Sequence, residues 1–362
     1  MDKTHILHEK ARNALRNIHN GDSNRELISY KTLRKLECDG KSVELEVELG
    51  YPAKTQMKSF RQRIHAALSE VSGLGKPNIS ITSRIAAHQA QTGTKRIPGV
   101  KNVIAVTSAR GGVGMSTATV NLALALADEG ARVGLLDADI YDHSILQMLG
   151  VAGQQTTSED GCLIEPLAVH GIETMSVGFF KETETPTLWR SPMVIQALEQ
   201  LLFGTRWHDL DYLLIDLPSG TGEVQLSILQ KAPICGALLV TTPQDIVLKD
   251  IKKYVRLFEK SGVALLGIME NMSIHICQHC GHTEHIFGSG GSEKISADFN
   301  VDCLGWLPID VQIRKAIDEG HPTMVSAPHS RAADIYRSIA RQMTARLALR
   351  PEETGENLPT SI

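Results

Sequence analysis

The chain has 362 residues, 42% of them hydrophobic and 22% charged, and this length suggests about two domains of roughly 150 residues each. Its 37 basic and 41 acidic residues give a net charge of −4, which argues against a general binder of nucleic acid or anionic membranes. No apolar run reaches the roughly 18 residues of a membrane span, and the first residues lack the apolar core of a signal peptide. The six cysteines are too scattered for a disulfide framework, so we expect a cytoplasmic protein in a reducing compartment.

The first hundred residues predict a small α+β domain over residues 1–85. Apolar residues recur with helical spacing in two segments and alternate with the period of a half-buried strand in two others. These helices and strands are expected at 6–19, 43–49, 55–71 and 78–82. Residues 86–99 are polar and contain glycine and proline, so they are interpreted as a linker to the rest of the chain.

From Val100 onward, short apolar runs rich in β-branched residues alternate with helical segments of roughly 10–20 residues. Such a rhythm predicts an α/β fold with a mostly parallel sheet that is covered by helices on both faces. The strands are expected at 103–106, 133–136, 175–177, 212–215, 237–241 and 265–269. This second domain is predicted to span 100–349, with a last amphipathic helix at 331–349 and a flexible polar tail at 350–362.

A glycine-rich turn separates the first of these strands from an alanine- and leucine-rich helix. Gly111, Gly112 and Gly114 allow backbone N–H groups to converge on an anion, and the following helix N-terminus favours negative charge. Ser116 is placed to supply a hydroxyl to Mg²⁺, and Thr117 a further contact to phosphate. The turn is therefore a candidate phosphate-binding loop, although a glycine-rich turn between a strand and a helix can also be purely structural.

Two positions depart from the usual phosphate-loop pattern of glycine, four residues, glycine, lysine and serine or threonine. Ala109 stands where the pattern has its first glycine, and Met115 stands where it has lysine. Methionine has nearly the length of lysine but none of its charge. The cation that normally holds the β- and γ-phosphates is therefore missing from this loop.

Acidic residues follow two of the other predicted strands. Asp139 and Asp216 come at strand ends, where parallel sheets of α/β proteins bind their ligands. Asp216 ends an apolar run and is predicted to hold hydrated Mg²⁺, while Asp139 is placed to orient a water molecule. Gly220 belongs to a loop that would respond to the γ-phosphate. Each residue alone is equally consistent with a helix cap or a turn, but their combination and order favour a nucleotide site.

Together these motifs resemble the deviant Walker A ATPases, the superfamily of MinD and ParA, and above all the Mrp (ApbC-like) family of iron–sulfur cluster carriers. The resemblance extends over residues 100–345, and residues 1–95 are similar to the small domain that precedes the ATPase in bacterial members. The matching segments are GGVG followed by ST and VNLALALA, VGLLDADIYDHSILQMLG, WRSPMVIQALEQLL, DYLLIDLPSGTGEVQLS, VTTPQD, GIMENMS and IFGSGG.

The resemblance implies a P-loop NTPase-type fold and roles for individual residues. Asn271 matches the position whose amide contacts adenine, and Arg110 replaces the lysine that reaches the nucleotide of the partner subunit. The two residues assigned to catalysis are thus Asp139 and Arg110. The residues expected to bind ATP and Mg²⁺ are Ala109, Arg110, Gly111, Gly112, Val113, Gly114, Met115, Ser116, Thr117, Asp216, Gly220 and Asn271.

Four departures from the family pattern border the predicted phosphate site. Besides Arg110 and Met115, Ser219 replaces a proline, and Asp142 with His143 replaces a glycine–proline pair. None of them touches the cysteine motif described next. The chain resembles an ATP hydrolase, but the missing lysine leaves open whether it hydrolyses ATP, and we expect hydrolysis to be impaired.

A C-x-x-C motif, Cys277 and Cys280, follows the predicted strand at 265–269. Two thiolates cannot close a four-ligand metal site, but two copies related by a two-fold axis bring four together, enough for a bridging [4Fe–4S] cluster. The resemblance implies this arrangement: a homodimer that transfers its cluster to apo iron–sulfur proteins, with neither nucleic acid nor membrane as partner.

Other interpretations of the motif remain open. His282 and His285 lie close enough in sequence to complete a Cys₂His₂ zinc site within one chain, which would make the protein a non-enzymatic scaffold or regulator. Surface thiols without metal are a third possibility. A positioning ATPase of the MinD and ParA type is disfavoured by the cysteine pair and by the lack of a basic amphipathic helix at the C-terminus.

Overall fold

The computed structural model describes residues 3–19, 21–22, 26–29, 31–38, 42–140, 144–158, 163–180, 190–220, 222–277 and 279–353. The chain divides into two compact units. The first comprises Met1–Ala86 and Asp128–Gly130, and the second comprises Ala87–Ala127 and Ala131–Ile362. Whether these units fold independently, with the boundaries at 85/86 and 99/100 that the sequence predicts, stays a prediction.

The first unit packs two helices on a three-stranded sheet. Strand β2 runs antiparallel to β1 and parallel to β3, in the order β1-β2-β3. Every second residue of β2, from Val43 to Leu49, is buried, while glutamates occupy the positions between, which accounts for the alternation seen in the sequence. The elements are α1 (Lys3–Arg16), β1 (Leu33–Cys38), β2 (Ser42–Leu49), η1 (Lys54–Gln56), α2 (Met57–Ser69) and β3 (Lys76–Ser83).

The second unit is built on a mostly parallel sheet with the strand order β11-β10-β9-β4-β8-β5-β7-β6, in which β12 also pairs with β10. Within this sheet, the antiparallel pairs among the described strands are β10 with β11 and β7 with β6. The strands are β4 (Val100–Ser108), β5 (Val133–Asp137), β6 (Leu167–Val169), β7 (Ile172–Met175), β8 (Leu210–Asp216), β9 (Ile234–Thr241), β10 (Leu265–Ile276), β11 (Thr283–Glu284) and β12 (Cys303–Ile309).

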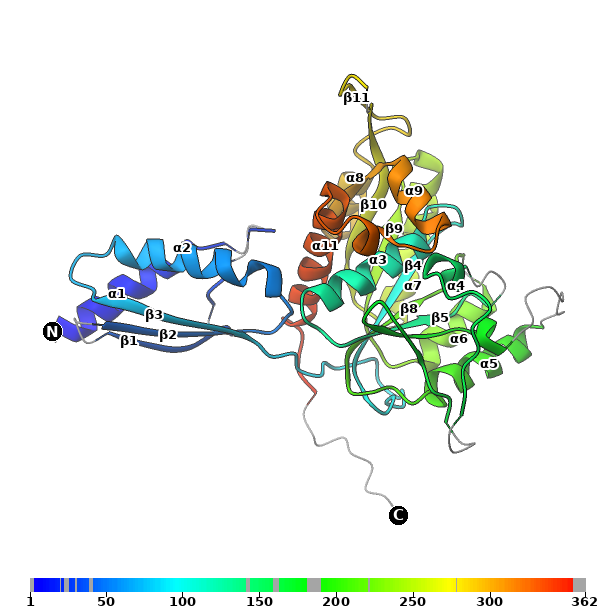
Figure 1. Cartoon of the computed structure of the whole chain (residues 1–362), viewed down its shortest axis with the longest axis horizontal. Helices are drawn as coiled ribbons and strands as arrows, with labels where there is room; N and C mark the ends of the chain where they lie inside the picture. The colour runs from blue at the N-terminus through cyan, green and yellow to red at the C-terminus, as the bar shows by residue number, and fades with distance from the viewer. Residues whose placement is uncertain are drawn as a thin grey trace, which may run out of the picture. The chain divides into compact units, whose positions relative to one another are not determined.

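Helices pack around this sheet and cover its central strands (Figure 1). Every residue of β5, β8 and β9 is buried, which explains why these strands form continuous apolar runs in the sequence. The predicted α/β class is confirmed. The helices are α3 (Met115–Asp128), α4 (Ile145–Met148), η2 (Val177–Phe180), α5 (Ser191–Phe203), α6 (Glu223–Lys231), α7 (Asp245–Lys260), α8 (Gly291–Phe299), α9 (Val311–Asp318), α10 (Thr323–Ser326) and α11 (Arg331–Leu347).

The segment that the sequence suggests is a linker, 86–99, is anchored by side chains from residue 87 onward. His88 is buried and donates its backbone N–H to Asn102 Oδ1 at 3.0 Å, and Gln91 Nε2 donates to the carbonyl of Ala232 at 2.9 Å. The first residues of the expected tail also have partners, because Gln89 donates to the carbonyl of Pro351 and Arg96 donates to Glu353. The composition of the segment shows its turn-forming residues, but it does not predict these hydrogen bonds with distant parts of the chain.

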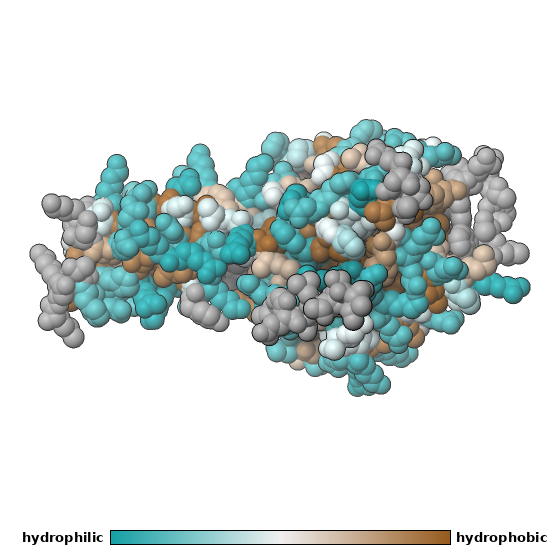
Figure 2. Space-filling view, turned by 90° about the horizontal axis from the view of Figure 1, so that it is seen from below, coloured by the Kyte–Doolittle hydropathy of each residue, from teal (hydrophilic) through white to brown (hydrophobic). Residues whose placement is uncertain are grey.

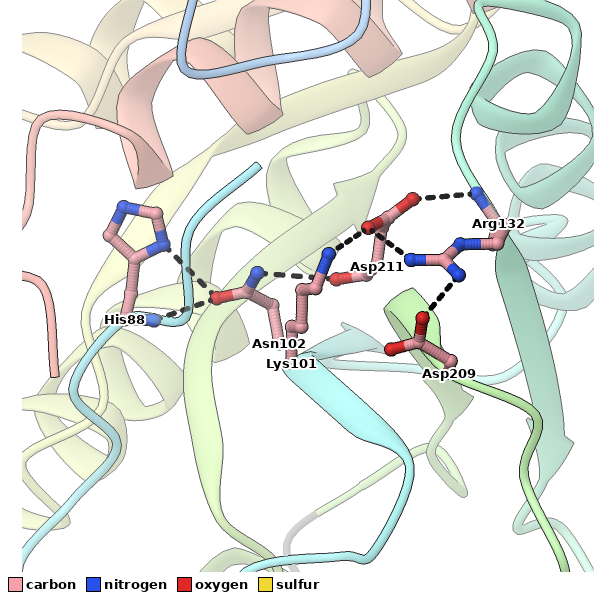
Figure 3. A network of polar contacts seen from close by, with 6 residues as sticks. All are labelled: His88, Lys101, Asn102, Arg132, Asp209 and Asp211. Atoms are coloured by element: carbon pink, nitrogen blue, oxygen red, sulfur yellow. Dashed lines mark hydrogen bonds and ion pairs between the residues drawn. The ribbon is translucent and has the colours of Figure 1, made fainter. Parts of the chain in front are cut away.

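A polar network joins the starts of three strands (Figure 3). Asp211, at the start of β8, accepts from Lys101 Nζ at 2.7 Å and from the Arg132 backbone N–H at 3.0 Å. Asn102, which is fully buried in β4, donates to the Asp211 carbonyl at 3.2 Å and accepts from His88. Arg132 also contacts the exposed carboxylate of Asp209. The network fixes β4, β5 and β8 at the edge opposite their carboxyl ends.

Hydrophilic and hydrophobic residues are intermixed over the described surface in Figure 2. Within the described ranges, no helix has both the length and the apolar character needed to cross a membrane.

Candidate nucleotide site and cysteine hairpin

The glycine-rich turn lies between the carboxyl end of β4 and the start of α3. Gly112 and Gly114 have φ angles of 80° and 78°, a region that favours glycine. A Cβ on Gly114 would lie 2.5 Å from Asn271 Nδ2, so a side chain here would displace that amide. The turn leads directly into the N-terminus of α3 at Met115, whose free backbone N–H groups and dipole attract anions.

Asp216 ends β8 beside this helix and is only 1% exposed. Its Oδ1 accepts from Thr119 Oγ1 at 2.5 Å, whereas Oδ2 is buried without a hydrogen-bond partner among the described residues. Burial raises the pKa of Asp216 to about 7, against the opposing effect of the Ser116 and Thr119 hydroxyls. A buried carboxylate oxygen without a donor, next to a serine hydroxyl and a helix N-terminus, fits a divalent cation beside a phosphate chain.

A second carboxylate, Asp137, lies opposite Asp216 in the register of β5 and β8. It is buried and accepts from Ser176 Oγ and from the Asp139 backbone N–H, each at 3.1 Å. Burial, and then the charge of Asp216, raises the pKa of Asp137 well above its usual value. Asp139 is only half-buried, and its charge also acts on Asp216. The sequence analysis names Asp139 for this site, and the role of Asp139 stays a prediction; Asp137, the last residue of β5, is the more deeply buried of the two.

The loop after Asp216 lies against the glycine turn. Gly220 donates its N–H to the Ser108 carbonyl at 3.4 Å, with a φ angle of 93°. Ser219 Oγ lies 3.3 Å from where a Cβ of Gly111 would be. Buried Gln225 holds the start of α6 in place, because it donates to Thr107 Oγ1 and accepts from Tyr254, so that the loop is positioned from both ends.

The two positions that usually carry lysine differ in character. At the second of them, Met115 is buried and adds no charge to the turn. Ala109, which stands at the first glycine of the pattern, is buried as well. Arg110 is exposed and donates from Nε to Asp250 Oδ2 of α7 at 2.7 Å. This hydrogen bond with Arg110 lowers the pKa of Asp250. The described structure therefore pairs the cation at the turn with a carboxylate of its own chain.

Asn271, on β10, connects with the turn by its side chain. Its Nδ2 donates to the Val113 carbonyl at 2.9 Å, and its Oδ1 accepts from the Met272 backbone N–H at 2.9 Å. Both polar atoms of the amide thus have protein partners. The contact with adenine that the resemblance implies stays a prediction.

The cysteine pair lies in the turn that joins β10 to β11, beyond the main body of the sheet (Figure 1). Cys277 N–H donates to the His282 carbonyl and Gly281 N–H donates to the Cys277 carbonyl, each at 2.9 Å. Cys280 is exposed, Cys277 is half-buried, and both are free thiols. The backbone N–H of Cys280, followed by that of His279, lowers the pKa of Cys277, so this turn favours a thiolate.

Two histidines of this hairpin, His275 and His285, have protein partners. His285 Nδ1 donates to the Ser273 carbonyl at 2.9 Å, and His275 Nδ1 lies 3.1 Å from Glu284 Oε1. Across the described part of the chain, no three His, Cys, Asp or Glu side chains are grouped so that they could hold a metal ion. The geometry thus offers two thiolates and no one-chain zinc site in these ranges. Cys162, Asp142 and His143 lie outside the described residues.

Comparison with known proteins identifies the family. The family model described as "NUBPL iron-transfer P-loop NTPase" matches residues 99–344, and one described as "Iron-sulfur cluster assembly protein" matches residues 8–81. This chain belongs to the NUBPL-type iron-transfer P-loop NTPases. The resemblance and the fold expected from the sequence motifs are therefore confirmed.

Similar proteins cover most of the chain. The iron–sulfur cluster carrier protein of Haemophilus influenzae is 43% identical over 89% of this chain and 87% of its own length. That of Escherichia coli K12 is 42% identical over 93% and 90%, respectively. A solved structure, the nucleotide-binding protein of Archaeoglobus fulgidus in complex with ADP, is 34% identical with a TM-score of 0.55, covering 61% of this chain and 87% of that one. The chain is thus similar to iron–sulfur cluster carriers along both of its units.

Proposed function

We propose that two copies of this chain hold a [4Fe–4S] cluster between them, through Cys277 and Cys280 of each, and transfer it to apo iron–sulfur proteins. The observation that carries the proposal is the hairpin itself, which presents two free thiols without further metal-ligating side chains grouped around them in the described ranges. A four-thiolate site then requires a second copy. The similar carriers of H. influenzae and E. coli support iron–sulfur cargo.

Delivery in this scheme is ligand exchange without electron transfer. The thiolates of the recipient replace those of Cys277 and Cys280 at the iron atoms one by one, so that each Fe–S(Cys) bond lost is matched by one formed. The released thiolates take up protons or bind the next cluster. An exposed position at a turn suits such exchange, because an incoming thiolate can approach the iron from solvent.

The glycine turn is proposed to bind ATP with Mg²⁺, and residues 109–117 would surround its phosphates. Ser116 and Asp216 are the residues that would hold the cation, directly or through water, and Thr117 would contact phosphate. Bound Mg²⁺ would neutralise charge on the phosphate oxygens. Asp139 would orient water, Gly220 would approach the γ-phosphate, and Arg110 would act on the nucleotide of the partner subunit. Without a lysine at 115, we expect hydrolysis to be slow.

Anaerobic reconstitution with iron and sulfide tests the cluster proposal. We expect about four iron and four sulfide per dimer, with broad absorption in the blue region. Cys277→Ala and Cys280→Ala should each abolish the cluster, whereas Cys303→Ala, at a thiol on β12 outside the hairpin, should keep it. One zinc per monomer, lost in His285→Ala, would replace the proposal by the zinc-scaffold alternative.

A further inference from the structure

Asn271 and Met272 place one short part of β10 directly on the glycine turn. Besides the bond from Asn271 to the Val113 carbonyl, both side chains lie over Gly114. A Cβ on Gly114 would come within 2.5 Å of Asn271 Nδ2 and 3.9 Å of Met272 Cε. Because the Asn271 amide donates to the Val113 carbonyl, a shift of the turn at Val113 acts directly on this hydrogen bond.

The backbone at Met272 is irregular. Its φ angle is 55°, a conformation that side-chain-bearing residues rarely adopt and that persists only where the surroundings enforce it. The register between β10 and β12 shifts here, because Glu270 pairs with Trp306 but Ile274 pairs with Pro308. Three residues of β10 thus stand opposite one of β12. We call residues 271–273 the β10 bulge.

Hydrogen bonds hold the β10 bulge from both sides. Asn271 Oδ1 accepts from the Met272 N–H, and Ser273 Oγ donates to the Leu307 carbonyl at 3.0 Å. The Ser273 carbonyl accepts from His285 Nδ1, which lies beyond the cysteine turn. A continuous series of contacts therefore runs from Val113 through the bulge to the far strand of the hairpin.

We propose that the β10 bulge couples occupancy of the phosphate turn to the position of the Cys277–Cys280 hairpin, with Asn271 as the positioning residue. The inference deepens the proposed function, on which its biological meaning rests. A ligand that moves the Val113 carbonyl weakens or strengthens its bond with Asn271. Because the same amide holds Met272 in its unusual conformation, the bulge responds and re-aims the strand that ends at the cysteines. Coupling of this kind is reciprocal.

A double-mutant cycle, in which amide hydrogen exchange is the measured quantity, tests the coupling without any nucleotide. His285→Ala removes the bond to the Ser273 carbonyl and should speed amide exchange in residues 109–117 by about fivefold or more. Asn271→Asp keeps the acceptor for the Met272 N–H but loses the donor to Val113. In that background, His285→Ala should change the exchange of the turn no further. His275→Ala is the matched control, because it alters the hairpin at a histidine that contacts Glu284 rather than the bulge.

An equal effect of His285→Ala in both backgrounds, or none in the parent protein, would overturn the coupling. Asn271→Ser serves in place of Asn271→Asp if circular dichroism shows that the aspartate variant does not fold.

Alkylation of the full chain by iodoacetamide, with and without Mg-ATP, tests the same coupling from the other end. Peptide mass spectrometry should find that Mg-ATP changes the rates at Cys277 and Cys280 several-fold in the parent protein, but not in His285→Ala, which breaks the series of contacts outside the nucleotide site. A nucleotide effect that survives His285→Ala would contradict the proposal. If the parent protein bound no nucleotide, the ATP part of the proposed function would fail, and the exchange cycle would still decide the coupling.

Discussion

Arg110 of the glycine turn donates from Nε to Asp250 Oδ2 of α7 at 2.7 Å. The pair joins residues 140 positions apart, and the arginine side chain is 46% exposed. Exposed ion pairs contribute little to stability, so this one restrains Arg110 without fixing it. A polyphosphate, with several negative charges, competes readily for the same guanidinium. Under the proposed role of Arg110, Asp250 would hold the guanidinium within its own chain until a second copy binds.

Asp250→Asn should release Arg110 with little effect on the free energy of unfolding. If the proposed role of Arg110 holds, nucleotide-dependent dimerisation and single-turnover ATP hydrolysis should both increase. Sedimentation velocity and quench-flow measurements check this. Asp298→Asn is the matched control, because Asp298 forms an exposed ion pair at 2.6 Å with Lys252, which lies on α7 like Asp250. Equal gains in both variants would indicate a general effect of surface charge.

Met115→Lys should act in opposite directions on the free and the nucleotide-bound protein. The methionine is 7% exposed, so an ammonium at this position is desolvated before phosphate arrives, and the unfolding temperature of the free protein should fall. With Mg-ATP, the new charge-assisted contact is worth about 1.5–3 kcal/mol, or roughly a ten- to hundredfold gain in affinity. Thermal unfolding measures the fall in unfolding temperature, and calorimetry measures the gain in affinity for Mg-ATP. Met115→Leu serves as the uncharged control.

Turnover is the second measurement on this turn. Met115→Lys combined with Ala109→Gly should give measurable ATP hydrolysis, because preorganised positive charge acts most strongly on the transition state. The unmodified protein should remain close to background. Rapid hydrolysis by the unmodified chain, abolished by Asp139→Ala, would show that the missing lysine does not limit catalysis.

Asp211 should stabilise the second unit in a pH-dependent way. Burial by itself would raise its pKa, but the Arg132 backbone N–H and the Lys101 and Arg132 side chains outweigh burial and lower it. A pKa below that of the unfolded chain gives stability that is fully present above about pH 4 and is lost as the pH falls through the folded-state pKa. Asp211→Asn should cost about 1–3 kcal/mol at pH 7, and the cost should shrink as the pH falls below about 4.

Urea unfolding at several pH values, followed by tryptophan fluorescence, measures this effect. Asp209→Asn is the control, since Asp209 contacts the same arginine but is 72% exposed, and its loss should change stability by less than about 1 kcal/mol at any pH. A cost for Asp211→Asn that does not vary with pH would mean that the charge of Asp211 adds nothing to stability.

Local patterns in the sequence predicted the elements that bury whole faces. The alternation at 43–49 became β2, and the apolar run at 212–215 became the centre of β8. The pattern at 33–38 did not predict β1, because the register with β2 shifts between Leu33 and Lys35 and breaks its alternation. The strand β12 was also missed, since its glycine and proline are typical of loops.

For the candidate site, too, the sequence predicts some of the residues and not others. The glycines and Asp216 could be chosen from the sequence because the pattern that identifies each of them lies within a few neighbouring residues. Thr119, Asp250 and the contact of Asn271 with Val113 could not, because each depends on a partner from a distant segment that only the sheet order brings near. The unusual backbone at Met272 has no sequence signal, since methionine is not a residue that favours positive φ.

Removing residues 87–99 should destabilise the second unit, although composition alone suggests a passive linker. A fragment that starts at residue 87 keeps the bond from His88 N–H to Asn102 Oδ1 and that from Gln91 to the Ala232 carbonyl. A fragment that starts at residue 100 leaves the Asn102 Oδ1 atom, which belongs to a fully buried side chain, without its donor from His88. The loss of a hydrogen bond of this kind costs about 0.5–1.5 kcal/mol.

The two fragments should therefore differ by at least that amount in the free energy of unfolding measured with urea. His88→Pro in the longer fragment removes the backbone donor together with the imidazole Nδ1, which also lies 3.0 Å from Asn102 Oδ1, and should reproduce part of the difference. Equal midpoints for the fragments starting at 87 and 100 would mean that the bonds of this segment add no net stability, and that it serves as a linker after all.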